Sequence, residues 1–419
     1  MYRKDELPNG VRVITEKVDY VRSVSLGVWV KCGSRCETEM TSGTAHFIEH
    51  MLFKGTNRRS ALDIASAIES LGGVMNAYTG KELTSFYVKV PDYNVEAALD
   101  VLADMFLHPR FDEGDIEREK SVVQQEISLL EDTPDDYIHD YCEARFWQGH
   151  GLGQPILGRR EVVEGFTRSE LYKFFRERYC GRNVVITAAG HLAHDRLVKL
   201  CEATFGELPG NALSYCSSPS PTVSQEISVL ERDLEQVHMI VAMPGPSAVD
   251  EKRYAAIILN TILGGSMSSR LFQEIREKRG MAYAVNSFWA PYMETGMFGV
   301  YAGAGVKEIR EVAGLVLQEL RKMAEEHMSS EELKRAKELV KGNYLLSMEN
   351  TDTRMSRLAR GEIYFGRHFE EEEILAAVDR VTQKDILDLA REMFSWDLTT
   401  IVAIGPIREK EFFLDILRP

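Results

Sequence analysis

The sequence lacks the features that would place the chain in a membrane or on a secretory route. Its first ten residues contain no apolar stretch of the kind that a secretory signal requires. No apolar run approaches the roughly 20 residues needed to cross a bilayer. Acidic residues outnumber basic ones by 65 to 50, and the net charge of −15 argues against nucleic acid or an anionic membrane as partner. A cytoplasmic protein is therefore expected.

Cysteine is scarce and irregularly placed. The 419 residues include six cysteines, whose spacing follows no disulfide framework and predicts reduced thiols. Cys32 and Cys36 are four residues apart, but no second pair accompanies them, which argues against a cysteine zinc site. Hydrophobic residues make up 44% of the chain and charged residues 27%, as in an ordinary globular protein of two or three domains.

The same order of predicted elements occurs twice along the chain. Alternating and helical patterns in the first half predict strands at 11–15, 23–31, 74–79 and 84–90, and helices at 45–54, 60–71, 93–107 and 112–131. The second half predicts strands at 237–243 and 296–301, and helices at 252–263, 307–327 and 329–348. A stretch rich in Pro, Gly and Ser at 206–224 has the composition of a linker. We predict an α+β protein of two homologous units, each a mostly antiparallel sheet with helices on one face. The domain boundaries are 1–208 and 225–419, joined by the linker 209–224.

The stretch 41–56 carries the strongest chemical signal. Thr41, Ser42 and Thr44 offer side-chain oxygens that could cap a helix, and Gly55 is a natural stop. On such a helix, the first and last residues of His46-Phe47-Ile48-Glu49-His50 lie one turn apart on one face.

Two imidazoles at this spacing can hold one zinc ion, and the carboxylate of Glu49 can take a proton from water. The alternative is a helix whose histidines make ordinary hydrogen bonds. The apolar neighbours of His46 and His50 predict a buried helix, on which ionisable groups need partners. Aligning Gly55 with Gly264 places apolar residues of the second half (Ala255, Ile258 and Leu259) at the three ionisable positions. Histidine is therefore not needed to fold this helix.

The predicted helix 112–131 offers a third ligand. Glu119 and Glu126 share an arc with the apolar residues Ile116, Val123 and Ile127, so they are predicted to face the core. A solvated charge run would explain the carboxylates on the opposite side of the helix, but buried carboxylates require a partner. In the second half, Ala336 and Asn343 occupy the positions of the two glutamates.

These residues resemble the pitrilysin-type (inverzincin) metallopeptidases, a family that includes insulysin and the mitochondrial processing peptidase. The family motif H-x-x-E-H is followed by a metal-binding Glu some seventy residues later, and here Glu126 follows His50 by 76 residues. Matching segments cover essentially the whole chain and favour the processing-peptidase branch: 43–46, 50–55, 76–79, 155–158 and 268–280.

The resemblance implies one zinc ion per chain, held by His46, His50 and Glu126, with Glu49 as the general base. Glu119 would support the site from outside the ligand shell. The reaction expected is hydrolysis of peptide bonds by metal-activated water, without a covalent intermediate.

The resemblance also implies substrate contacts. Asn76, Ala77, Tyr78 and Thr79 match an edge-strand segment that pairs with extended peptide. In the second half, Arg276 and Tyr283 match a family pair that contacts substrate opposite the zinc.

The alternatives stay open for several of these residues. Without the family, Arg276 would be a surface ion-pairing residue and Tyr283 a core aromatic. Trp147 and His150, in another family-like segment, are expected to be structural.

Insulysin-like chains contain four such units around a chamber, whereas this chain contains two. The resemblance therefore implies a homodimer, or a heterodimer with a related subunit, that acts on unfolded and possibly basic peptides. An alternative is a catalytically silent or partner-dependent subunit of a two-subunit processing peptidase, against which the intact motif argues. Hydrolysis of a small thioether by another H-x-x-E-H enzyme is disfavoured because such chains are much shorter.

Overall fold

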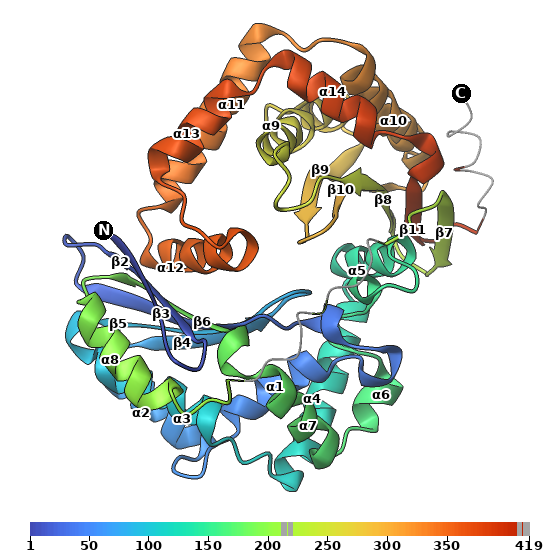
Figure 1. Cartoon of the computed structure of the whole chain (residues 1–419). Coiled ribbons are helices and arrows are strands. Elements are labelled where there is room, and N and C mark those ends of the chain that lie inside the picture. Colours follow the sequence, from blue (N-terminus) through green and yellow to red (C-terminus); the bar gives the residue numbers. More distant parts are fainter. Residues whose placement is uncertain (211–215, 217–220, 409–412, 414–419) are drawn as a thin grey trace. The chain divides into compact units, whose positions relative to one another are not determined.

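The computed structural model describes residues 1–210, 216, 221–408 and 413. The chain forms two compact units, each of which includes a segment from the other half of the sequence. The first unit comprises Met1–Leu129, Gln154–Ser218 and Ser347–His368. The second comprises Leu130–Gly153, Pro219–Leu346 and Phe369–Pro419. Figure 1 labels their helices and strands.

The first unit is an α+β domain. Its strands are β1 (Tyr2–Glu6), β2 (Arg12–Lys17), β3 (Ser23–Val30), β4 (Val74–Thr79), β5 (Thr84–Pro91) and β6 (Val184–Gly190). Its helices are α1 (Thr44–Phe53), α2 (Ala61–Ser70), α3 (Val95–Leu107), α4 (Glu113–Glu131), α6 (Arg160–Glu164), α7 (Arg168–Arg178), α8 (His194–Phe205) and α12 (Thr351–Arg360).

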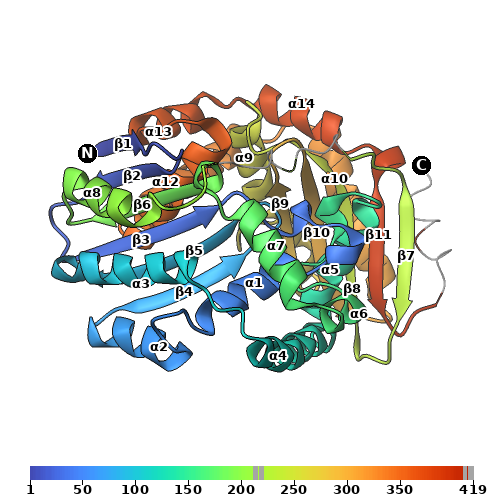
Figure 2. The same ribbon diagram turned by 60° about the horizontal axis from the view of Figure 1, so that its bottom comes forward.

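The six strands form one sheet in the order β1-β2-β6-β3-β5-β4, so β4 lies at an edge (Figure 2). Only β2 and β6 run parallel, and the other neighbours are antiparallel. Val28 of β3 pairs with Phe86 of β5 on one side and with Ile186 of β6 on the other. All three are fully buried. Their side chains point to the same face of the sheet, which is therefore covered at its centre.

Different helices cover the two faces. One face packs against the main core, to which α1, α3, α7 and α8 contribute apolar side chains. The other face carries a smaller cluster in which Trp29 packs with Met355 and Leu358 of α12, a helix from the second half of the sequence. In Figure 1, α12 lies on the face of the sheet opposite α3 and α8.

The second unit repeats this plan. Its strands are β7 (Glu226–Glu231), β8 (Gln236–Gly245), β9 (Ala282–Pro291), β10 (Gly296–Gly305) and β11 (Thr400–Gly405), in the order β7-β11-β8-β10-β9. Its helices are α5 (Pro134–Phe146), α9 (Arg253–Leu263), α10 (Ile309–Glu325), α11 (Ser330–Ser347), α13 (Glu371–Arg380) and α14 (Gln383–Met393). Here α5, from the first half of the sequence, packs on one face of the sheet through Ile138 and Cys142.

The predicted fold class is confirmed, since two sheets each pack with helices. The exchange of α5 and α12 between the halves was not predicted, because no periodic pattern reports which sheet a helix covers. The division at 208 and 225 follows the order of the chain rather than these packing units. The predicted linker lies largely outside the described residues. Within the described part of the chain, no helix is long and apolar enough to cross a membrane.

The expectation that all cysteines are reduced was wrong. Cys36 and Cys216, which are 180 residues apart in the sequence, form a disulfide within the first unit. Spacing along the chain could not reveal this pair, because the fold alone brings the two residues together. Cys32, Cys142, Cys180 and Cys201 are free and buried.

A buried carboxylate anchors the exchanged segment of the first unit. Glu362, which follows α12, pairs with Lys4 of β1 at 2.8 Å and with Arg12 of β2 at 3.1 Å. Only 3% of its side chain is exposed. The segment 347–368 is therefore tied to the sheet by charge as well as by apolar packing.

Substitution Glu362→Gln is expected to destabilise the first unit by about 1–3 kcal/mol, because the partly buried Arg12 and the more exposed Lys4 lose their countercharge. Urea denaturation followed by intrinsic fluorescence measures this change. Glu349→Gln, at an exposed position in the same segment, is the matched control and should change stability by less than about 0.5 kcal/mol. Equal behaviour of the two variants would contradict the anchoring role.

Candidate metal centre

The start of α1 is stabilised by the carboxyl group of a residue that precedes the helix. The buried Glu37 accepts hydrogen bonds from the backbone N–H groups of Gly43, at 2.7 Å, and Ala45, at 2.6 Å. Free N–H groups at a helix start need such acceptors. The predicted caps were wrong, because the N-cap residue is Gly43 and no side chain at that position caps the helix.

A pair of glycines sets the path of the chain into α1. Gly43 has φ of +91° and Gly158 has φ of +84°, a region that favours glycine. A Cβ atom on Gly43 would lie 2.7 Å from the Cα atom of Gly158, so neither position has room for a side chain. These glycines belong to two of the segments that resemble the peptidase family, and their contact gives a physical reason for both.

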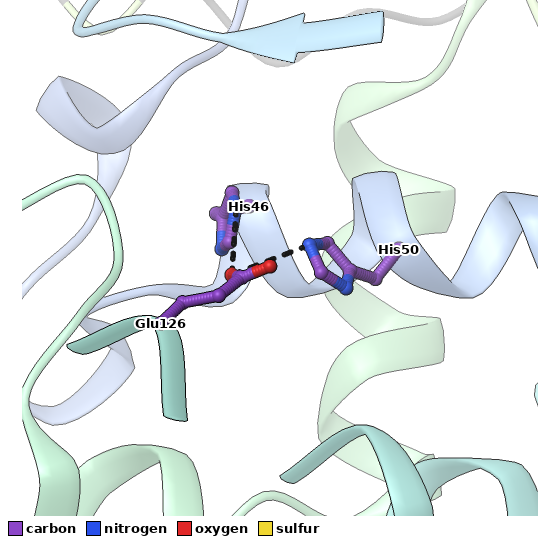
Figure 3. A group of neighbouring side chains, drawn as sticks. All are labelled: His46, His50 and Glu126. Atoms are coloured by element: carbon purple, nitrogen blue, oxygen red, sulfur yellow. Dashed lines mark ion pairs between the residues drawn. The ribbon is translucent and has the colours of Figure 1, made fainter. Parts of the chain in front are cut away.

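Three side chains converge beside this helix. His46 and His50 project from α1, and Glu126 of α4 points between them (Figure 3). The Glu126 Oε2 atom lies 3.7 Å from His46 Nε2 and 3.6 Å from His50 Nε2. One potential ligand atom from each residue falls within 4.8 Å of the others, and no other such trio occurs in the described part of the chain.

The spacing fits a metal ion better than direct contact. The two separations are too long for hydrogen bonds. Ligands held about 2.0–2.1 Å from a tetrahedral zinc ion are separated by about 3.4 Å. Glu126 Oε2 is buried without a hydrogen-bond partner in the described part of the chain, which is costly unless a cation supplies one. Two imidazoles and one carboxylate are also a typical ligand set of hydrolytic zinc sites.

The protonation of the two histidines differs. Burial, with a smaller contribution from the nearby His50, lowers the pKa of His46 to about 3, so its imidazole is neutral at pH 7. Burial also lowers the pKa of His50, but the hydrogen bond to Glu119 and the charge of Glu126 outweigh it, and the net shift is upward. A cation at the centre would replace the proton that these carboxylates favour on His50.

Glu119 supports His50 from outside the trio. The Nδ1–H group of His50 donates to Glu119 Oε2 at 2.9 Å, which directs Nε2 of the same ring toward Glu126. Lys54 lies 2.6 Å from the other oxygen of Glu119. The hydrogen bond to Glu119 fixes the orientation and tautomer of the His50 ring, as partners of metal-binding histidines commonly do.

Glu49 lies on α1 between the two histidines. Its carboxylate is partly buried and accepts a hydrogen bond from the Thr79 hydroxyl. Burial raises the pKa of Glu49, against the lowering effect of that hydrogen bond. A carboxylate with a raised pKa beside a metal centre suits proton transfer near neutral pH.

The remaining predicted residues fall in two places. Asn76, Ala77, Tyr78 and Thr79 form the end of β4, the edge strand of the sheet in the unit to which the trio belongs.

Arg276 and Tyr283 belong to the second unit, where the Arg276 guanidinium donates to the Tyr283 carbonyl at 2.9 Å and lies over its ring. Tyr283 is 79% exposed and therefore is not the core aromatic considered as an alternative. Trp147 is fully buried and His150 partly buried.

Sequence reasoning missed Glu37 and Lys54. Glu37 caps α1 from six residues before Gly43, outside the local windows in which capping motifs are recognised. Lys54 follows His50 by four residues, so helical spacing could have placed it beside Glu119 if the contact between α1 and α4 had been known.

Substitution Glu119→Gln is expected to weaken zinc binding about 10- to 100-fold, because the His50 ring loses its charged partner. Competition with a chromophoric chelator measures the affinity. Glu117→Gln, on the exposed side of the same helix, is the control and should bind zinc as the wild type does. Wild-type affinity in Glu119→Gln would contradict the supporting role.

The pKa of Glu37 predicts a pH dependence of stability. Burial raises this pKa to about 8, although two backbone hydrogen bonds oppose the shift. Between about pH 4.5 and pH 8 the folded protein holds a proton that the unfolded chain has lost, so the free energy of unfolding should fall as pH rises through this range. In Glu37→Gln the decline should be shallower, by up to about 1 kcal/mol per pH unit. Urea denaturation at several pH values tests this, with the exposed Glu39→Gln as control. Equal slopes in Glu37→Gln and the wild type would contradict the assignment.

Comparisons with known proteins match most of the chain to one peptidase family. Residues 12–160 match the family Insulinase (Peptidase family M16), and residues 165–340 match the family Peptidase M16 inactive domain. The uncharacterized zinc protease YmxG of Bacillus subtilis is 39% identical over 399 residues, which cover 95% of this chain and 97% of that protein. An uncharacterized zinc protease of Streptomyces coelicolor is 37% identical over 417 residues, or 98% of this chain and 90% of that protein.

Solved structures share the fold. The peptidase M16 inactive domain from Pseudomonas fluorescens superposes with a TM-score of 0.91 at 21% identity, covering 97% of this chain and 98% of that one. A protease from Helicobacter pylori gives the same TM-score at 19% identity, with 97% and 99% covered.

Proposed function

The chain belongs to peptidase family M16, and from this premise we propose that it is a zinc-dependent endopeptidase. The observation that carries the proposal is the convergence of His46, His50 and Glu126, with an unpartnered carboxylate oxygen between two imidazole nitrogens. Similar proteins named as zinc proteases support the choice of metal and of reaction class.

The residues divide the chemistry among them. His46, His50 and Glu126 would hold the zinc ion, which when bound supplies a Lewis acid that activates water and polarises the scissile carbonyl. Glu49 accepts the proton of the attacking water and then delivers it to the leaving amine. Glu119 keeps the His50 ring oriented throughout. No side chain attacks the substrate, so no acyl-enzyme forms.

We propose that the substrate is an extended peptide that pairs with β4. An edge strand presents free backbone groups, which can bind peptides of varied sequence. The side chains of Asn76 and Tyr78 are exposed along this edge. The net charge of −15 supports a preference for unfolded, cationic peptides.

We further propose that the protein acts as a homodimer or as a heterodimer with a related subunit. Arg276 and the exposed Tyr283 of one subunit would contact substrate and its developing oxyanion at the metal centre of the other. If so, mixing inactive Glu49→Gln chains with inactive Arg276→Ala chains restores activity, because one mixed site is then intact. No recovery in a mixture shown to exchange subunits would contradict this arrangement. A chain that binds zinc and cleaves only when a second, different subunit is added would instead be the partner-dependent subunit considered above.

The cytoplasmic location expected from the sequence remains a proposal. The Cys36–Cys216 disulfide argues against this location, because disulfides persist in oxidising compartments and are reduced in most cytosols.

Substitution Glu49→Gln is expected to lower kcat at least about 100-fold while zinc remains bound, because the variant retains all three ligands and loses the base. The experiment follows cleavage of an unstructured cationic peptide by mass spectrometry, with metal content measured on the same samples. Addition of a chelator to the wild type is the second control. Cleavage that survives both Glu49→Gln and the chelator would show that another activity is responsible.

A further inference from the structure

Thr79 makes a contact that the proposed chemistry does not yet use. It is the last residue of β4, and its hydroxyl donates a hydrogen bond of 2.5 Å to Glu49 Oε2. Within the described part of the chain, no other residue hydrogen-bonds the Glu49 carboxylate. The base therefore depends on a single side chain for its orientation.

The direction of the Thr79 side chain follows from the strand. Burial alternates along β4, with Met75, Ala77 and Thr79 less exposed than Val74, Asn76 and Tyr78. Met75 and Ala77 pack against the core that contains α1, whereas the Tyr78 ring lies against Trp29, which belongs to the other cluster. Side chains two residues apart point to the same face of a sheet, so Thr79 faces α1 and Glu49.

The contact gives the two oxygens of the Glu49 carboxylate different surroundings. Oε2 is occupied by the Thr79 hydroxyl, which leaves Oε1 to receive the proton of the attacking water. A charge-assisted hydrogen bond to one oxygen also restricts rotation of the carboxylate. Small misplacements of a reacting group are costly, since a shift of about 1 Å can lower a rate about 100-fold.

The same residue links the base to the substrate. Thr79 pairs with Thr84 of β5 on one side, and its other backbone edge is open. A peptide added to that edge would be held in register with β4. The last side chain of β4, that of Thr79, in turn holds the base Glu49.

We propose that Thr79 is a positioning residue. Its hydroxyl fixes one oxygen of Glu49, so that the base keeps a defined position relative to a peptide bound along β4. This rests on the proposed function of the site. It differs from a role in substrate binding alone, because it assigns the side chain of Thr79 to the base and only its backbone to the peptide.

The test compares Thr79→Val, which keeps the shape and loses the hydroxyl, with Thr79→Ser, which keeps the hydroxyl. In Thr79→Val, kcat should fall about 10- to 100-fold, while KM and bound zinc stay within about twofold of the wild type. Thr79→Ser should restore kcat to within about threefold. Thr84→Val is the matched control, because the Thr84 hydroxyl donates to the Cys32 carbonyl and not to Glu49, and its kcat should be close to that of the wild type.

Other outcomes would overturn the proposal. A raised KM with unchanged kcat would make Thr79 a substrate-binding residue only. Loss of zinc from Thr79→Val would show that it acts through the metal ligands, and equal losses in the valine and serine variants would show that the hydroxyl is irrelevant.

A crystal structure of Thr79→Val decides the geometry without any assay. We expect the Glu49 carboxylate to leave its wild-type position or to occupy more than one conformer, and a single unchanged conformer would contradict the proposal. If the wild type binds zinc but cleaves no peptide, the proposed function fails, whereas this structure still reports on the contact between Thr79 and Glu49.

Discussion

The burial of α1 is the constraint on which the metal centre depends. This helix packs its apolar residues into the core of the first unit, and three ionisable side chains emerge from it at positions that are only partly exposed. In that setting each charge or lone pair requires a partner. His50 has Glu119, Glu49 has Thr79, and the Nε2 atoms of both histidines face the Glu126 oxygen. A divalent cation at this point would give His46, His50 and Glu126 the partner that they cannot give one another.

The surroundings of the helix show how precisely such a centre has to be held. The Glu37 carboxylate fixes its first turn through two backbone N–H groups, and the contact between Gly43 and Gly158 fixes the path by which the chain enters it. At the other end, Lys54 binds the carboxylate that orients His50. Preorganised ligands and a preoriented base reduce the reorganisation required during the reaction. The strand β4 belongs to the same compact unit as α1 and α4, so this unit holds the proposed zinc ligands, the proposed base and the open strand edge.

The sequence predicted much of this arrangement, for identifiable reasons. Helical spacing placed His46, Glu49 and His50 on one face. The apolar arc of α4 placed both glutamates on the side that faces α1, although only Glu119 is buried and the side chain of Glu126 is 37% exposed. These signals are local, so they could be read from short windows of sequence.

What the sequence could not predict depends on contacts between distant segments. The disulfide between Cys36 and Cys216 and the packing of α12 on the first sheet join residues that are far apart in the sequence. The cap by Glu37 is closer, but it lies outside the positions at which capping motifs are recognised. Thr79 and Glu49 are 30 residues apart in the sequence. Each was predicted to belong to the site, but the contact between them could not be predicted.

The central claim is that His46, His50 and Glu126 form one zinc site, and anomalous diffraction at the zinc absorption edge tests it most directly. Crystals grown with zinc should give one strong peak per chain, about 2.0–2.2 Å from an Nε2 atom of each histidine and from a Glu126 oxygen. No peak at these residues, or a stronger peak at another position in the chain, would contradict the account.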